Sequence, residues 1–177
     1  FHYYRKALRS RFGVEISELT FEHFLYGDHD VRGATVVAFQ TPEEVDEAMR
    51  DRIMARITEV APTARRIYLD WFAPTDLRYA ALLGPHVDLY VKKHVLRDRS
   101  LYAQETYGDT TLMEFYGRRA GLDLETRRFA IPEGFLDKLL IGPSFLTADF
   151  LLPKLKRAEI PSGERPIDLH ARVAVTG

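Results

Sequence analysis

The feature that most constrains the fold is a pair of apolar, β-type segments joined by a helical segment. Residues 34–39 are continuously apolar or β-branched, and residues 67–71 form a second run of this kind. The segment between them has an apolar side chain at every third or fourth position, namely at Val45, Met49, Ile53, Ile57 and Val60. This spacing indicates a helix with one apolar face. A buried strand, a helix and a second buried strand form a right-handed βαβ unit. The sequence therefore predicts an α/β protein with a Rossmann-like open, mostly parallel sheet and flanking helices.

The predicted helix has signals at both ends. Thr41 is a favourable N-cap, Pro42 suits the first helical position, and Glu44 completes a T-x-x-E capping box. Ala61 and Pro62 predict the end of the helix.

Other segments extend the pattern in both directions. Residues 14–19 and 87–91 alternate apolar and polar side chains, which predicts two half-covered strands, the second near a sheet edge. Residues 1–12 are basic and amphipathic, and we interpret them as the first helix of a domain whose preceding strand is missing. Residues 109–121 predict a further helix, and residues 134–156 predict two short helices and a loop.

Composition limits the classes of partner. With 25 basic and 26 acidic residues the net charge is −1, which offers no general attraction for nucleic acid. No apolar run approaches the roughly 20 residues that span a bilayer, so no transmembrane segment is expected. The chain has no cysteine, which excludes disulfides and thiolate chemistry and fits a cytoplasmic location.

The motifs that mark common enzyme classes are absent from the sequence. It contains no Walker A loop, no G-x-G-x-x-G and no G-x-S-x-G elbow. Its six histidines never occur at i and i+4 with an acid between them. We therefore predict no bound cofactor and no metal site.

Polar and aromatic residues follow the strand predicted at 67–71. Asp70 and Trp71 lie at its carboxyl end, where open α/β sheets bind ligands. Trp71 fits core packing and sugar stacking about equally well. Asp76 follows Pro74 and Thr75, and we interpret it as a helix cap.

A basic cluster follows the strand predicted at 87–91. Lys92, Lys93, His94 and Arg97 could bind a phosphate or a sugar acid. The alternative is a solvated connection in which Arg97 pairs with Asp98.

Two weaker motifs contain acids. Asp28 and Asp30 match the D-x-D of metal-dependent sugar transferases, but a solvated turn explains them more simply. Asp109 and Thr111 lie at a predicted helix start, where they could contact an anion or simply cap the helix.

Several short motifs occur together in one order along the chain. They are residues 1–4, 36–40, 68–71, 87–93 and 108–109. In this order they resemble the N-terminal half of bacterial glycosyltransferases of GT-B architecture, of the group-1-like kind. Residues 165–173 look like the linker and first strand of the second Rossmann domain of that fold.

The resemblance implies a two-domain enzyme that transfers a sugar from a nucleotide-sugar donor without a bound metal. Residues 1–160 would form the acceptor-side domain, and residues 161–177 would begin the second domain, which binds most of the donor. The chain is then expected to be a piece of a longer protein and to be inactive alone. A sugar or glycan would be the acceptor.

The resemblance also implies a cleft at the strand ends. His2 and Asp70 are the candidates for the catalytic base. The residues expected to contact substrate are Gln40, Trp71, Lys92, Lys93, Asp109 and Thr111. The alternative function is a non-catalytic Rossmann-like or flavodoxin-like binding or regulatory domain.

Overall fold

The structure, a computed structural model, describes residues 4–27, 31–42, 44–107 and 111–142. The chain divides into two compact units, Phe1–Ser144 and Phe145–Gly177. All described residues belong to the first unit, and the residues expected to begin a second domain lie outside them.

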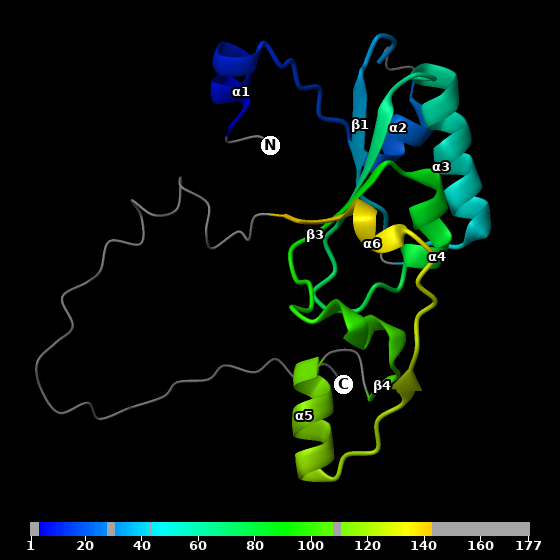
Figure 1. Ribbon diagram of the computed structural model, residues 1–177. Helices are drawn as coiled ribbons and strands as arrows, with labels where there is room; N and C mark the ends of the chain where they lie inside the picture. The colour runs from blue at the N-terminus through cyan, green and yellow to red at the C-terminus, as the bar shows by residue number, and fades with distance from the viewer. Residues whose placement is uncertain (1–3, 28–30, 43, 108–110, 143–177) are drawn as a thin grey trace, which may run out of the picture. The chain divides into compact units, whose positions relative to one another are not determined.

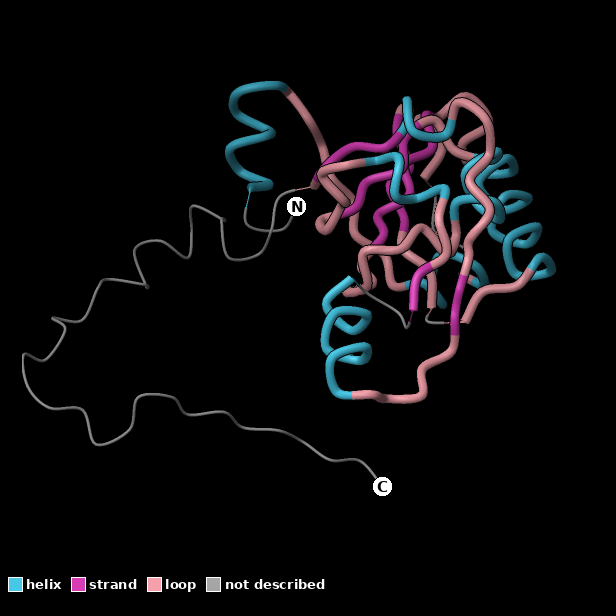
Figure 2. Tube along the Cα trace, turned by 60° about the horizontal axis from the view of Figure 1, so that its bottom comes forward, coloured by secondary structure: helices cyan, strands magenta, loops and turns pink. Residues whose placement is uncertain are grey.

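A four-stranded sheet forms the centre of this unit (Figure 1). Its order is β1 (Val36–Phe39), β2 (Arg65–Asp70), β3 (Leu89–Lys92) and β6 (Leu139–Ile141). Every neighbouring pair is parallel. Figure 2 shows these strands as magenta segments lying side by side. The predicted α/β class with an open parallel sheet is confirmed.

Helices and short segments connect these strands. The helix α3 (Glu47–Val60) joins β1 to β2, and α4 (Ala80–Leu83) with η2 (Gly84–His86) joins β2 to β3. The longer connection from β3 to β6 contains η3 (Arg99–Ala103), β4 (Thr106–Tyr107), α5 (Thr111–Ala120), β5 (Thr126–Arg127) and α6 (Phe135–Lys138). The strands β4 and β5 pair antiparallel. Two helices, α1 (Arg5–Phe12) and α2 (Phe21–Tyr26), precede β1.

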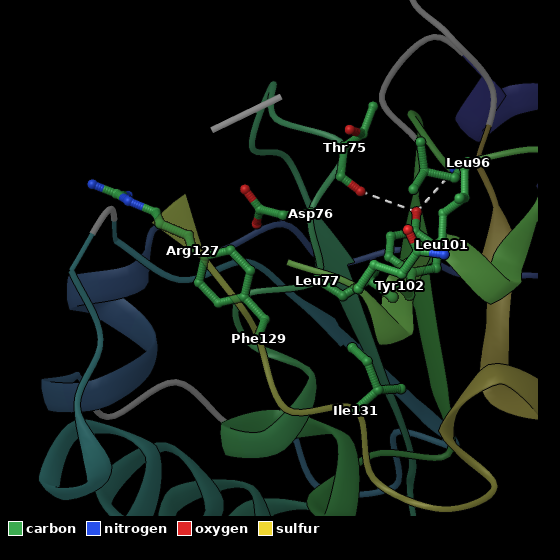
Figure 3. Close-up of a pocket in the computed structure, with 10 residues that line it drawn as sticks. Thr75, Asp76, Leu77, Leu96, Leu101, Tyr102, Arg127, Phe129 and Ile131 are labelled. Atoms are coloured by element: carbon green, nitrogen blue, oxygen red, sulfur yellow. Dashed lines mark hydrogen bonds between the residues drawn. The ribbon is translucent and has the colours of Figure 1, made fainter. Parts of the chain in front are cut away.

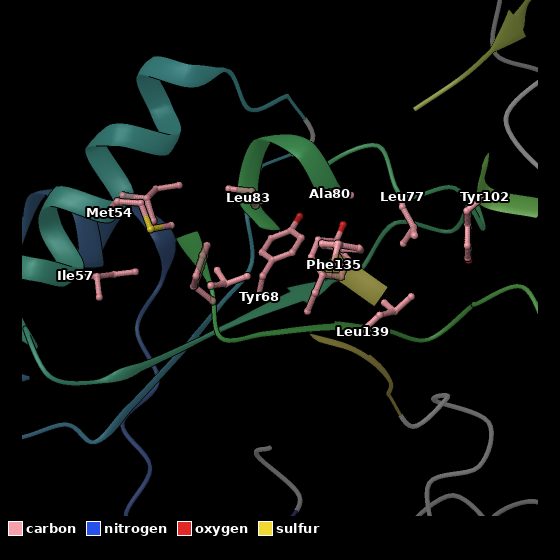
Figure 4. Close-up of a cluster of buried hydrophobic side chains, with 13 residues drawn as sticks. Met54, Ile57, Tyr68, Leu77, Ala80, Leu83, Tyr102, Phe135 and Leu139 are labelled. Carbon is pink, nitrogen blue, oxygen red and sulfur yellow. The ribbon is translucent and has the colours of Figure 1, made fainter. Parts of the chain in front are cut away.

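The main core lies between the sheet and the helices α3 and α4 (Figure 4). Ile53 and Ile57 of α3 are fully buried, as the apolar spacing predicted. Tyr68 and Tyr90 project from neighbouring strands, and their ring centroids are 5.0 Å apart at a steep angle. Such edge-to-face packing stabilises aromatic pairs beyond the apolar area they bury.

The start of α3 differs from the prediction. The helix begins at Glu47, and its N-cap is Asp46, whose carboxylate accepts a 2.7 Å hydrogen bond from the Met49 amide. The hydroxyl of Thr41 is buried and bonds instead to the hydroxyl of Tyr68 at 2.9 Å. The Thr41 hydroxyl is therefore bonded within the core and does not cap the helix. The predicted end is confirmed, because Val60 is the last helical residue.

Two strand predictions need correction. Residues 14–19 form no strand, and the acids of this segment pair with α1 instead, Glu15 with Arg9 and Glu18 with Arg5. The strand β3 begins at Leu89, because the preceding Asp88 uses its carboxylate to accept the Arg66 amide at 2.7 Å. It is also not at an edge, since β6 lies beyond it.

The helix predictions at both ends of the described chain are largely confirmed. The basic segment near the N-terminus contains α1, which ends at Gly13 in the left-handed conformation with φ 65°. The helix α5 ends before Gly121, whose φ is 63°. Within residues 134–142 only α6 is helical, and the apolar residues after it form β6 rather than a helix.

Candidate functional site

A buried ion pair joins the carboxyl ends of β2 and β3. Asp70 and Lys92 are partners in the parallel register, and their Oδ2 and Nζ atoms are 2.9 Å apart. Their side chains are 0% and 1% exposed. The Tyr90 hydroxyl donates to the same oxygen at 2.7 Å, while the Phe72 amide donates to Oδ1 at 3.0 Å. Both oxygens of the Asp70 carboxylate are thus satisfied inside the protein.

This arrangement gives Asp70 and Lys92 a positioning role. A buried carboxylate is stable only when charge and hydrogen bonds compensate its lost hydration, and here an ammonium group and two donors do so. Lys92 also lies 3.4 Å from the Phe72 carbonyl. The pair therefore fixes the start of the loop that follows β2. Neither side chain reaches the surface, which differs from the expectation that Asp70 could act as a base and Lys92 could bind an anion.

Trp71 lies directly after this pair. Its indole Nε1 donates to the Thr41 carbonyl at 2.9 Å, and its ring stacks on Phe72 with centroids 4.5 Å apart and planes 23° apart. The residue is nevertheless 43% exposed. Trp71 therefore packs against the protein and also presents part of its ring to solvent, and the sugar-stacking interpretation stays a prediction.

His94 contacts the same loop from the end of β3. Its Nδ1 lies 3.0 Å from the carbonyl oxygen of Ala73, two residues beyond Trp71. A carbonyl oxygen can only accept, so Nδ1 carries the proton, and in a neutral ring Nε2 holds the lone pair. His94 is exposed, so Nε2 can accept a proton from a bound molecule. The sequence placed His94 in a basic cluster but did not reveal this tautomer.

The remaining predicted site residues are less informative. Gln40 follows β1 and is exposed, as is Lys93 after β3. Thr111 is the first residue of α5. His2, Asp109 and the acids of the D-x-D match lie outside the described residues. The structure thus brings Asp70, Trp71 and Lys92 together and adds Thr41 and Phe72, which the sequence did not assign to the site; His94, which the sequence placed in the basic cluster, contacts the same loop.

The basic cluster after β3 does not converge on one point. Lys92 is directed inward to Asp70, and His94 bonds to a backbone carbonyl. Asp98 accepts from the Ser100 amide and hydroxyl at 3.0 and 2.7 Å, so it does not serve as the predicted partner of Arg97. These hydrogen bonds hold the pKa of Asp98 below its usual range.

Asp76 forms an ion pair with Arg78 and does not cap a helix. Its carboxylate accepts from the Arg78 backbone amide at 3.1 Å and from the guanidinium Nε and Nη2 at 2.9 and 2.6 Å. The helix α4 begins later, at Ala80, with Tyr79 at the N-cap position. Arg78, two residues after Asp76, supplies three hydrogen-bond donors to the carboxylate. The carboxylate is therefore not available to cap the helix that was predicted from the sequence.

A small pocket lies beside this acid (Figure 3). Its lining is mainly apolar and includes Leu77, Tyr102, Phe129 and Ile131. Its interior is about 20 Å³, which is roughly the room for one water molecule and too little for a sugar ring. The exposed Trp71 surface is therefore the stronger candidate for a ligand site.

Two kinds of feature are absent from the described part of the chain. It contains no group of three His, Cys, Asp or Glu side chains positioned to hold a metal ion. None of its helices combines the length and apolarity that crossing a membrane requires.

The comparisons with known proteins give no family. No protein-family model matches the chain, and neither a curated protein nor a solved structure resembles it with statistical significance.

The buried tyrosines should make the free energy of unfolding depend on pH in the alkaline range. Burial raises the pKa of both Tyr68 and Tyr90, and the Asp70 carboxylate raises the pKa of Tyr90 further. The unfolded chain then releases these protons near pH 10 while the folded protein keeps them. Stability should be constant below that pH and fall above it by about 1.4 kcal/mol per pH unit for each tyrosine.

Urea unfolding between pH 8.5 and 11 measures this slope. The Tyr68→Phe variant should show a shallower decline, because it removes one of the tyrosines whose pKa the fold raises, the others being Tyr90 and Tyr102. Tyr26→Phe, at an exposed ring, is the matched control and should keep the full slope. An equal slope in the Tyr68→Phe variant and the unmodified chain would contradict the assignment.

Proposed function

We propose that this chain is the acceptor-side domain of a GT-B-like glycosyltransferase, which transfers a sugar from a nucleotide-sugar donor to a sugar or glycan acceptor. The observation that carries the proposal is the half-exposed indole of Trp71 at the carboxyl edge of a parallel sheet. Ligands of open α/β sheets bind at this edge. An aromatic ring with a free surface is a suitable platform for the C–H face of a sugar.

Rigidity strengthens this interpretation. The hydrogen bond to Thr41 and the stacking on Phe72 hold the Trp71 ring in one orientation. The buried pair of Asp70 and Lys92 holds the loop beneath it. A ring that is fixed before binding loses little conformational entropy when a ligand arrives. The acceptor sugar would therefore stack on a preformed surface.

His94 supplies the acid–base group in this proposal. Its Nε2 would accept the proton of the acceptor hydroxyl as that oxygen attacks the donor sugar, while the Nδ1–H bond to Ala73 keeps the ring oriented. The nucleotide leaves with the bonding electrons of the donor. Because the sequence has no phosphate-binding loop, the nucleotide would bind mainly outside the described residues.

A direct test uses the only tryptophan in the chain. Titration with mono- and disaccharides should change the fluorescence of Trp71, because a stacked sugar displaces water from the indole. Calorimetry should show that Trp71→Ala weakens binding about tenfold or more, the size expected for loss of an aromatic contact.

Phe115→Ala removes another exposed aromatic ring and serves as the control for this experiment. It should leave sugar binding unchanged. Uridine diphosphate should bind weakly or not at all. Tight binding of nucleotide without binding of any sugar would argue against the acceptor-side assignment.

The base is tested in the full-length protein that contains this domain. We expect His94→Ala to lower the turnover number about a hundredfold, within the usual range for a general base, with little change in the KM for the acceptor. His23→Ala, at an exposed histidine of α2, should retain activity. Equal turnover in both variants would exclude His94 as the base.

A non-catalytic binding module is the second candidate. The observation that favours it is the complete enclosure of Asp70, the acid at the carboxyl end of β2. Sugar binding that depends on Trp71, without transfer by the full-length protein, would support this alternative.

A further inference from the structure

The strand order limits which elements can cover each face of the sheet. The strands β1, β2, β3 and β6 follow one another in a single direction across it. Because crossovers between parallel strands are right-handed, all three connections lie on the same face. The core contains residues of α3, α4 and α6 together with strand residues Phe39, Tyr68, Tyr90 and Leu139, which agrees with this rule. No connection between strands is left for the opposite face.

The opposite face is apolar. The register aligns Ala38, Ile67 and Leu89 in one row and Leu69, Val91 and Leu140 in the next. None of these side chains is buried, whereas the strand residues of the core face are mostly enclosed. All-parallel sheets usually have both faces covered by protein. We refer to these six residues as the second face.

The helix α1 has an apolar stripe that the core does not use. None of its residues is buried, and Phe12 is 71% exposed. Leu8 lies one turn before Phe12, on the same side of the helix. Four of the other six positions are cations, Arg5, Lys6, Arg9 and Arg11, and the helix has no acid. The stripe is therefore narrow and flanked by residues that prefer solvent.

The neighbouring helix α2 packs against the core and α3, and so it is not available to cover the second face. Its Phe24 packs against the core, and Arg56 of α3 donates to the carbonyls of Phe24 and Gly27 at 3.0 and 2.6 Å. Among the described residues outside the strand connections, α1 is thus the helix that remains available for the second face.

The geometry points to α1 as the cover of the second face: we propose that Leu8 and Phe12 dock across β2 and β3, within the same chain. An eight-residue helix is about 12 Å long, and four strands span about 14 Å. Residues 13–20 can extend over about 26 Å when the exposed pairs of Glu15 and Glu18 with α1 open, which is enough to pass from α2 around the sheet. Most of the cations of α1 lie on the other sides of the helix from Leu8 and Phe12, so they can remain in water when these two side chains dock. This inference does not depend on the proposed function.

The absence of cysteine makes a cross-linking test clean. We would introduce Leu8→Cys together with Leu69→Cys and oxidise the dilute chain. Leu8→Cys with Glu59→Cys, an exposed position on α3, is the control pair. The first pair should form an intramolecular disulfide in at least tenfold higher yield than the control, and peptide mass spectrometry should identify it. Intermolecular disulfides would overturn the proposal in favour of a second copy, and equal yields in the two pairs would overturn it outright.

A second measurement does not depend on forming a disulfide. The labelling rate of a maleimide at Leu69→Cys reports how often the second face opens. Adding Phe12→Asp should increase this rate about tenfold, because a charge at that position opposes apolar burial. Adding Arg11→Asp, at a neighbouring exposed position of α1, should leave the rate unchanged. An unchanged rate with Phe12→Asp would show that α1 does not cover the face.

Discussion

Replacing Lys92 by methionine should lower the free energy of unfolding by about 3–5 kcal/mol. The substitution keeps most of the side-chain volume but removes the ammonium group 2.9 Å from Asp70. The carboxylate then remains buried with the Tyr90 hydroxyl and the Phe72 amide as its hydrogen-bond donors, and no cation compensates its charge. Urea unfolding at pH 7, followed by far-ultraviolet circular dichroism, measures the loss.

Two comparisons distinguish this effect from a general effect of removing a positive charge. Arg118→Met breaks the exposed pair with Glu114 and should change stability by no more than about 0.5 kcal/mol. Adding Asp70→Asn to Lys92→Met should recover part of the loss, because the amide is neutral and still accepts a hydrogen bond. A loss below about 1 kcal/mol for Lys92→Met would mean that water reaches the pair.

Replacing Phe135 by alanine should also cost about 3–5 kcal/mol. The residue is 2% exposed, and its ring centroid lies 5.0 Å from that of Tyr90 in an edge-on arrangement. It fills the space over Gly84, where a Cβ atom would lie only 2.6 Å from the Phe135 ring. The truncated side chain would leave a cavity between α6 and the sheet. Urea unfolding measures this loss as well.

The matched variant is Phe115→Ala, at an exposed phenylalanine of α5, and it should be nearly neutral. Gly84→Ala provides an independent test of the same contact, since overpacking should cost about 1–3 kcal/mol. If Phe135→Ala and Phe115→Ala had equal stabilities, α6 would not pack on β3 as described.

The parts of the fold that local patterns determine were predictable from the sequence. The strand at 67–71 and the end of the helix at Val60 follow from apolar runs and from the Ala61-Pro62 stop signal. The carboxyl edge of the sheet followed from the parallel βαβ arrangement, and with it the positions of Asp70 and Trp71 at the end of β2.

The errors came from interactions between residues far apart in the sequence. The strand β6 has only three residues and is stabilised by pairing with β3, so its own sequence resembles a helix. Thr41 looked like a cap because nothing local indicates its bond to Tyr68. The inward direction of Lys92 depends on the register between two strands, which no short motif encodes.

The ion pair at the end of this register has a consequence for the uniqueness of the sheet. A slip of one residue would place Val91 opposite Asp70 and turn Lys92 to the other side. That alignment would leave a carboxylate buried beside an aliphatic side chain, which is a large penalty. The pair therefore selects one alignment of β2 and β3 against its nearest competitor. Stability and the choice of alignment are thus determined by the same two side chains.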